Sequence, residues 1–148
     1  MKKSIQSHSL QTTKRIAKEL AKTIFKSPKG REAFVLALKG ELGAGKTSFV
    51  QGLARGLGVT GNVLSPTFLI VKQYKLSKQR NFYHIDCYRL KSPKELLSLE
   101  WKEIIQNPNN IVAVEWADKV KSIIPKHALW VSFFYMDKEL TMRKIVVG

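Results

Sequence analysis

The sequence is short of cysteine, of acidic residues and of long apolar runs. Its single cysteine, Cys87, excludes an internal disulfide, so we expect a reduced, cytoplasmic location. No stretch approaches the roughly 20 apolar residues of a membrane-spanning helix. The residues that follow Lys2 and Lys3 are too polar for a signal-peptide core, and we expect no membrane partner.

Positive charge is what the chain has in excess. Among 148 residues, 26 Lys and Arg stand against 11 Asp and Glu, which gives a net charge of +15. Such a charge favours polyanionic partners, through direct RNA contact or through proximity to RNA inside a complex. The basic residues are spread along the chain without a long block, so a general lysine bias of the proteome explains the charge equally well.

The first half of the chain alternates helical and strand patterns. Residues 9–26 carry apolar residues at helical spacing with lysines on the other face, and Ser9 or Thr12 is the expected cap. The apolar run at about 32–38 predicts a strand, and a second helical pattern follows at 46–57.

The second half is predicted to be richer in strands. Residues 68–74 and 81–86 are expected to form an antiparallel hairpin across the basic turn 75–80. A capping-box pattern with proline at the first helical position opens a helix over about 92–105. Further strands are expected at 111–114, 128–135 and 139–147, with a turn at 136–138 between the last two. The whole pattern predicts one α/β domain over residues 1–148, with a mixed central sheet flanked by helices.

The strongest local signal is GELGAGKT at residues 40–47, which fills every fixed position of the phosphate-loop pattern G-x-x-x-x-G-K-[ST]. Its glycines allow the backbone to turn tightly and point N–H groups at a phosphate chain. Lys46 can reach the β- and γ-phosphates, and the Thr47 hydroxyl can ligate Mg²⁺. A glycine-rich turn without function is the alternative. Because a strand pattern precedes the loop and a helical pattern follows it, we expect a P-loop NTPase fold.

Two carboxylates end predicted strands. In open α/β sheets, ligands lie beyond the carboxyl ends of the strands. Glu115 follows four apolar residues, as a Walker B carboxylate does, and could hold Mg²⁺ directly or through water. Asp86 shares a strand face with His84 and Tyr88 and could orient the attacking water or bind Mg²⁺ through water. The structural alternatives are a surface carboxylate for Glu115 and a packed histidine for His84.

Three further features gain meaning beside a phosphate site. Trp116 is either a core residue or a stacking partner for the base. The stretch SPTF at 65–68 is either an ordinary turn or a nucleotide-sensing loop whose hydroxyls approach the γ-phosphate. Arg89 is either a solvated charge or a compensator of negative charge.

GELGAGKT, SPTF, HIDCYRL at 84–90 and EWAD at 115–118 occur in an order and spacing that resemble the TsaE (YjeE) family. Its members are small ATPases needed for the threonylcarbamoyladenosine (t6A) modification of tRNA. The resemblance extends from about Thr13 to Arg143, which is nearly the whole chain. It implies hydrolysis of ATP with Mg²⁺ within a complex with TsaD and TsaB, where the ATPase resets the machine that transfers the threonylcarbamoyl group.

The resemblance also implies roles for individual residues. Lys46 would contact phosphates, and Thr47 and Glu115 would bind Mg²⁺. Asp86 would assist hydrolysis or the metal site, and Trp116 would lie at the nucleotide. The loop residues expected to contact the nucleotide are Glu41, Leu42, Gly43, Ala44, Gly45, Lys46, Thr47 and Ser48.

Other positions match the family less directly. Thr13 corresponds to a family threonine in the first helix and is expected to line the nucleotide pocket. Arg143 falls at a family arginine in the last strand. Glu41 replaces the usual aspartate, Ser48 a second threonine, and Ala117 a frequent proline, and none of these changes removes a phosphate or metal ligand.

Three other classes of protein are alternatives to such an ATPase. A small-molecule or nucleoside kinase also uses a phosphate loop but needs a lid, and the turn at 75–80 is the only candidate. A GTP-dependent switch is disfavoured because the guanine-reading N-K-x-D pattern is absent. A nucleic-acid-binding module is favoured only by the net charge. Since no arginine finger is assignable, the ATPase is predicted to be weak alone.

Overall fold

The computed structural model describes residues 2–136 and 142–148. Within these residues, seven strands form one sheet. They are β1 (Lys3–Ser7), β2 (Phe34–Gly40), β3 (Val71–Lys75), β4 (Asn81–Asp86), β5 (Asn110–Glu115), β6 (Leu129–Tyr135) and β7 (Arg143–Val147). Their order is β1-β7-β6-β2-β5-β4-β3. β2 pairs in parallel with β5 and β6, β4 pairs in parallel with β5, and the outer pairs are antiparallel.

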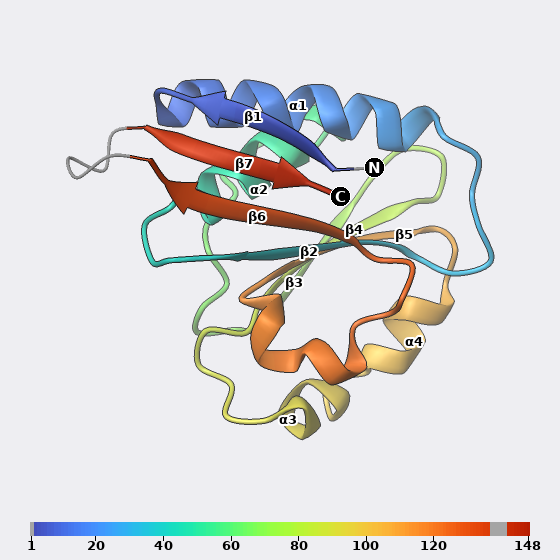
Figure 1. The fold of residues 1–148 in the computed structure, drawn as a ribbon. Helices are drawn as coiled ribbons and strands as arrows, with labels where there is room; N and C mark the ends of the chain where they lie inside the picture. The colour runs from blue at the N-terminus through green and yellow to red at the C-terminus, as the bar shows by residue number, and fades with distance from the viewer. Residues whose placement is uncertain (1, 137–141) are drawn as a thin grey trace.

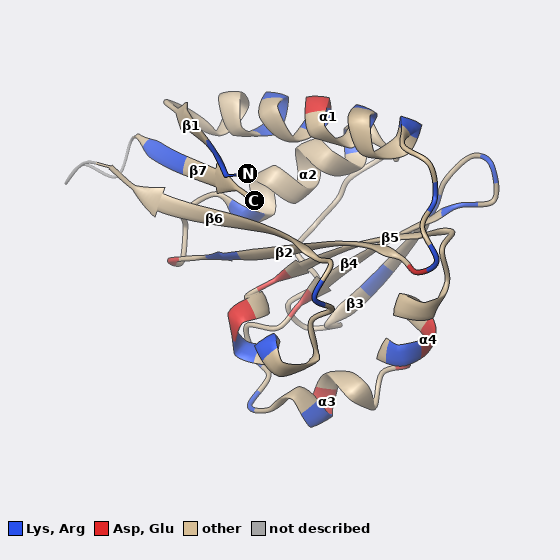
Figure 2. Ribbon diagram, turned by 45° about the vertical axis from the view of Figure 1, so that its right-hand side comes forward, with Lys and Arg blue, Asp and Glu red and all other residues tan. Residues whose placement is uncertain are grey.

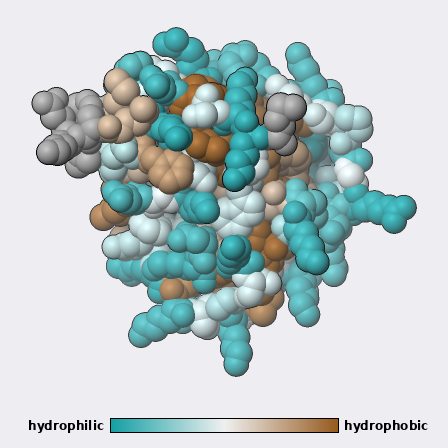
Figure 3. Space-filling model, in the orientation of Figure 1, coloured by the Kyte–Doolittle hydropathy of each residue, from teal (hydrophilic) through white to brown (hydrophobic). Residues whose placement is uncertain are grey.

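Helices cover both faces of this sheet (Figure 1). The helices α1 (Leu10–Lys26) and α2 (Lys46–Gly56) lie on one face. The short helices α3 (Pro93–Leu97) and α4 (Trp101–Gln106) lie on the other with the 3₁₀ helix η1 (Ala117–Ile123). Hydrophilic side chains cover most of the molecular face seen in Figure 3.

Period-two alternation in the central strands supplies one core to each face. On β2, Leu36 and Leu38 belong to the cluster beneath α1 and α2, whereas Val35 and Ala37 belong to the cluster beneath α3, α4 and η1. All six residues of β5 are buried, as expected for a parallel strand covered on both sides.

Two glycines bring α1 and α2 into close contact. A Cβ added to Gly52 would collide with the backbone carbonyl of Lys14, and one added to Gly56 would lie 2.5 Å from the carbonyl oxygen of Lys18. The backbones of the two helices therefore meet without a side chain between them at these two positions.

The α/β class, the mixed sheet and most of the elements are confirmed. The first helix begins at Leu10, and the Ser9 side chain caps it by accepting from the Thr12 N–H at 3.1 Å. The hairpin is antiparallel, but its first strand begins at Val71. The preceding Ile70 has a φ of 67°, which a strand does not permit.

Two expectations were wrong. The helix over 92–105 is two helices, because Glu100 lies between them in the left-handed region with a φ of 63°. Proline does occupy the first turn of α3, but the expected capping box is not formed. The Ser92 side chain makes no capping hydrogen bond to the helix, and the Glu95 carboxylate accepts from the Lys91 N–H at 3.0 Å. No strand was expected at β1, which is largely polar.

The last two strands were expected to pair across a turn at 136–138. β6 and β7 do pair as antiparallel neighbours. Most of that turn, together with the first residues of the strand expected at 139–147, lies outside the described residues. Among the helices that the structure describes, none is long and apolar enough to cross a membrane.

Candidate functional site

The parallel strands bring the two predicted carboxylates to one edge of the sheet. Asp86 and Glu115 are the last residues of β4 and β5, and they lie level with each other in the strand register. Leu38 of β2 lies level with Glu115 on its other side. The glycine-rich loop leaves β2 two residues later and enters α2, so the carboxylates face the N-terminus of that helix.

A pocket of about 400 Å³ opens at this edge. It brings together most of the predicted site residues, namely Leu42, Gly43, Gly45, Lys46, Thr47, Ser48, Asp86, Glu115, Trp116 and Arg143. Ser65 and Thr67 of the SPTF segment also line it, together with Leu10 and Tyr88, which were not predicted as ligands.

The loop at 40–45 depends on glycine at two points. Gly45 precedes α2 with a φ of 103°, in the left-handed region that favours glycine. A Cβ on Gly40 would lie 2.7 Å from the carbonyl oxygen of Phe133. No side chain caps the first turn of α2, so its N–H groups are available to an anion.

Lys46 is held inside the loop. Its Nζ donates to the carbonyl oxygens of Gly40 at 2.5 Å and Glu41 at 2.8 Å, and it lies 4.0 Å from the ring centre of Trp116. Burial lowers the pKa of Lys46, and nearby carboxylates, chiefly Glu115, oppose the shift. Phosphate oxygens are stronger acceptors for an ammonium than these carbonyls. An entering phosphate chain would therefore replace the carbonyls as the partners of Lys46.

Glu115 is the centre of a buried polar network. Its side chain is 3% exposed. Its Oε1 accepts from the Thr47 hydroxyl at 2.9 Å, and its Oε2 accepts from His84 Nε2 at 2.5 Å. His84 therefore fixes the orientation of the carboxylate, and Thr47 brings a second oxygen beside it.

These two oxygens suit Mg²⁺. The ion prefers oxygen ligands and is usually held by one or two protein groups together with waters and substrate phosphates. Thr47 and Glu115 supply such a pair at the edge of the pocket. Within residues 2–136 and 142–148, no cluster of three or more His, Cys, Asp or Glu side chains could hold a metal alone. Waters and bound phosphate groups would complete the coordination.

Asp86 ties a surface segment to the pocket. Its Oδ2 accepts from the hydroxyls of Ser65 at 2.9 Å and Thr67 at 2.8 Å, and its Oδ1 accepts from the Tyr88 N–H at 2.9 Å. The hydroxyls of SPTF thus meet a carboxylate in this structure. The same segment exposes large apolar side chains, since Phe68 is 80% and Leu69 67% exposed.

Trp116 is a half-buried wall of the pocket. Its φ of 57° is left-handed, which turns the chain between β5 and η1. Its ring centre lies 5.1 Å from that of Tyr88 and beneath the ammonium of Lys46. Arg143 also lines the pocket, with its guanidinium carbon 5.7 Å from the ring centre of Tyr135.

Some predicted residues lie behind the pocket surface. Thr13 is fully buried, and its hydroxyl lies 2.8 Å from that of Ser7. Its methyl group is 3.7 Å from where a Cβ would project from Gly45, so it supports the loop from beneath. Ala44 is also fully buried, and Glu41 contributes its carbonyl to Lys46.

The basic turn at 75–80 lies away from the pocket. It joins β3 to the first residue of β4, at the opposite end of that strand from Asp86. Arg80 Nη1 donates to the carbonyl oxygen of Phe25 at 3.2 Å, and the Lys78 ammonium lies 5.8 Å from the ring centre of Phe25. The turn therefore packs against the end of α1 and does not cover the site.

The role of His84 was missed by sequence reasoning. The signal was present in its position two residues before Asp86, on the same strand face. That position indicates a partner only once the register between β4 and β5 is known. The register places His84 level with Ala113 and within reach of Glu115. Arg89, for which the sequence left two roles open, lies with its guanidinium carbon 4.1 Å from the ring centre of Phe68.

Comparison with known proteins relates the chain to a family. The family model described as "Threonylcarbamoyl adenosine biosynthesis protein TsaE" matches residues 7–145. A Haemophilus influenzae protein named tRNA threonylcarbamoyladenosine biosynthesis protein TsaE is 37% identical over 106 residues. That match covers 72% of this chain and 66% of the relative, so the chain spans just under two thirds of that protein.

Other relatives match over more of their length. A Rickettsia prowazekii protein of the same name is 33% identical over 131 residues, which are 88% of this chain and 87% of the relative. Among solved structures, Bacillus subtilis YdiB superposes with a TM-score of 0.73 and 28% identity, covering 99% of this chain and 84% of that one. The chain belongs to the TsaE family.

Proposed function

We propose that this protein is a Mg²⁺-dependent, cytoplasmic ATPase that acts in the t6A modification of tRNA together with TsaD and TsaB. The observation that carries the ATPase proposal is the network at Glu115. A carboxylate oriented by His84 lies beside the Thr47 hydroxyl, at the uncapped N-terminus of α2 and in one pocket with Lys46. In P-loop NTPases the loop lysine binds the phosphates, while the loop hydroxyl and a strand-end carboxylate hold Mg²⁺, and these groups have the same chemistry.

The loop and α2 would bind the phosphates as a P-loop does. N–H groups of residues 41–48 would cradle the chain, and Lys46 would move from its loop carbonyls to the β- and γ-phosphates. Thr47 and Glu115 would hold Mg²⁺, which neutralises charge between the phosphates.

Asp86 and Trp116 would each contact the bound nucleotide. Asp86 would orient the attacking water, because its carboxylate faces the pocket and is held by Ser65 and Thr67. Trp116 would stack on the base, a contact worth about 1–3 kcal/mol in comparable pairs. Adenine is the expected base since the N-K-x-D pattern that reads guanine is absent from the sequence.

A partner protein would complete the site. Leu64, Phe68 and Leu69 are largely exposed on the segment that contacts Asp86 through its hydroxyls. Contiguous exposed apolar residues of this kind mark interaction surfaces. TsaD or TsaB would cover them and act on the nearby carboxylate, so turnover by the isolated protein would be weak. A kinase reading is less well supported, since the turn at 75–80 lies far from the pocket.

The proposal is tested by measuring ADP release with Mg²⁺ or with EDTA, first for the protein alone and then with TsaD and TsaB. We expect slow, Mg²⁺-dependent release that the partners accelerate. Typical kinase rates of about 1–100 s⁻¹ without partners would contradict the dependence on them. Acceleration by added metabolites or nucleosides in place of the partners would favour the kinase.

A further inference from the structure

A second hollow lies outside the nucleotide pocket. It is a groove of about 500 Å³ between α1, α2 and the segment at 62–64. Its floor is backbone, because Gly52 carries no side chain where α1 crosses α2. Its walls carry four cations, Lys14, Arg15 and Lys18 from α1 and Arg55 from α2.

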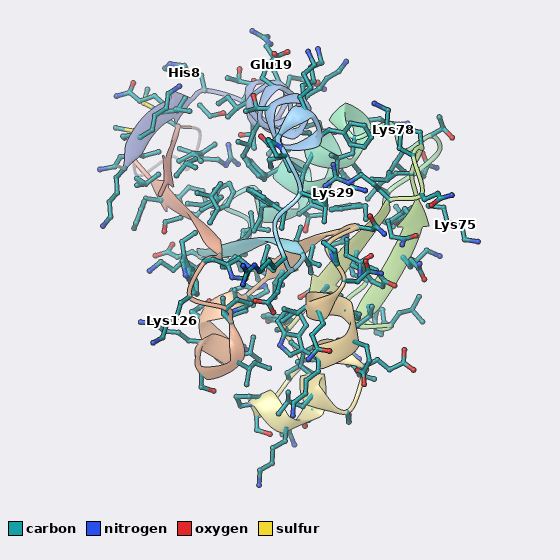
Figure 4. The ribbon with its side chains drawn as sticks, turned by 90° about the vertical axis from the view of Figure 1, so that its right-hand side faces the viewer. His8, Glu19, Lys29, Lys75, Lys78 and Lys126 are labelled. Atoms are coloured by element: carbon teal, nitrogen blue, oxygen red, sulfur yellow. The ribbon has the colours of Figure 1, made fainter. Side chains whose placement is uncertain are left out.

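Among the residues that the structure describes, the groove is lined by no Asp or Glu. The one acidic residue of α1, Glu19, lies 3.4 Å from Lys22 and projects away from the sheet, as Figure 4 shows. Figure 2 shows how Lys and Arg recur along this helix. None of the ion pairs formed by the described residues involves the four groove cations.

The walls are positioned to hold an extended anion. Lys14 and Lys18 are one helical turn apart, a rise of about 6 Å along α1. Opposite them, Arg55 Nη1 donates to the carbonyl oxygen of Val59 at 3.3 Å. Gln51 Nε2 fixes the third wall by donating to the carbonyl oxygen of Val63 at 2.8 Å. Four like charges around one groove repel one another, and this repulsion is relieved when successive anionic groups lie between them.

We propose that this groove binds RNA through its phosphodiester backbone. A strand of phosphates matches cations arranged along a groove better than a single phosphate does, and the amides of Gln11 and Asn62 add donors for phosphate and sugar oxygens. The choice of RNA among polyanions rests on the proposed function in tRNA modification. Leu64 lines the groove and Ser65 lines the nucleotide pocket, so the bound strand lies beside the site of hydrolysis.

The test measures binding of labelled tRNA to the full chain by fluorescence anisotropy, without nucleotide, over a series of salt concentrations. The groove variant Lys14→Gln/Lys18→Gln/Arg55→Gln removes three cations and keeps good helix formers. Each lost contact to a single strand lowers the salt slope by about 0.7, so we expect the slope to fall by about 2. We also expect affinity near 0.1 M salt to fall about tenfold or more.

The matched control is Lys75→Gln/Lys94→Gln/Lys126→Gln. It makes the same change in net charge at exposed positions outside the groove, and Figure 4 shows Lys75 and Lys126 on other elements. This variant should keep most of the slope and affinity. Equal losses in both variants would show binding to the overall charge and overturn the proposal, as would unchanged binding in the groove variant. Thermal melts of both variants confirm that each is folded.

Two further measurements separate the alternatives. In a competition assay, polyglutamate and inorganic polyphosphate should displace labelled tRNA less effectively, per unit charge, than unlabelled tRNA does. Equal displacement would overturn the choice of RNA and make the groove a site for polyanions in general. ADP release by the groove variant should equal that of the unmodified protein, because none of its residues lines the nucleotide pocket. Loss of RNA binding with normal hydrolysis in the groove variant supports the groove as an RNA site. RNA binding without any hydrolysis in the unmodified protein would support the groove as an RNA site and reject the proposed ATPase.

Discussion

The two ends of β4 and β5 both carry polar residues in matching register but use them differently. At the amino ends, Asn81 lies level with Asn110, and at the carboxyl ends Asp86 lies level with Glu115. Asn81 Nδ2 donates to Asn110 Oδ1 at 3.2 Å, and Asn110 Nδ2 donates to the carbonyl oxygen of Ile104 at 2.8 Å. These amides join the two strands to α4, so at this end the polar groups stabilise the fold.

At the carboxyl ends, the pair consists of carboxylates and faces a pocket. Asp86 and Glu115 are almost fully buried, although a buried charge is costly unless cations or donors surround it. Their donors include Ser65 and Thr67 on an exposed segment, and Thr47 at a helix N-terminus. The register places polar residues at both ends of the two strands. Only the carboxyl ends carry charged side chains that face a pocket, so these ends form the candidate site.

The largest effect is expected from removing charge at the carboxyl end. Glu115→Gln keeps the shape of the side chain but loses the carboxylate that would hold Mg²⁺ with Thr47. ADP release in the presence of the partners should fall by about 10²-fold or more. The midpoint of thermal unfolding should fall only modestly, because the amide oxygen can still accept from Thr47 although the bond to His84 is lost. Full activity in this variant would exclude Glu115 from the metal site.

The next effect concerns the residue that positions this carboxylate. His84→Ala removes the bond from Nε2 to Glu115, and the apparent affinity for Mg²⁺ in ADP-release assays should fall about 10–100-fold. A purely structural role would lower stability without moving the Mg²⁺ dependence. Partial rescue by His84→Gln, whose amide N–H can donate, is expected; equal Mg²⁺ titrations for all three proteins would rule out the positioning role.

The amino end should respond in the opposite way. Asn110→Ala leaves Asn81 Nδ2 and the carbonyl of Ile104 without their partner, which should lower the free energy of unfolding by about 1–3 kcal/mol. Urea denaturation measures this change. ADP release per folded molecule should stay unchanged. An activity loss as large as that of Glu115→Gln would remove the distinction between the two ends.

A smaller effect is expected at the exposed segment beside the pocket. Phe68→Ser should leave slow hydrolysis by the isolated protein intact and weaken the association with TsaD and TsaB about tenfold, since an exposed aromatic side chain is a typical anchor of an interface. Lys78→Ser, on the exposed turn at the other end of β4, is the matched control. Equal association of both variants would contradict the docking role of this segment.

Local patterns predicted the elements that form the candidate site, but long-range pairing decided the rest. The residues of GELGAGKT and the two strand-end carboxylates could be identified because each has a local signature. β1 could not, because its polar residues gain strand structure only by pairing with β7 from the other end of the chain. The break at Glu100 and the bond from His84 to Glu115 likewise depend on tertiary context, which a single sequence does not encode at a fixed spacing.

Cys87 provides the finest test, because it follows Asp86 directly yet faces the core. Burial raises the pKa of its thiol from 9.0 to about 12, with the charge of Asp86 adding to the shift. Between these values the unfolded chain loses the proton while the folded chain keeps it, so the free energy of unfolding should fall as pH rises. The fall should reach about 1.4 kcal/mol by about pH 10, in urea denaturation, and should be absent from Cys87→Ala. An equal fall in both proteins would assign the pH dependence to other groups, and rapid reaction of the native thiol with a thiol reagent at about pH 8 would place Cys87 in the pocket with its neighbour.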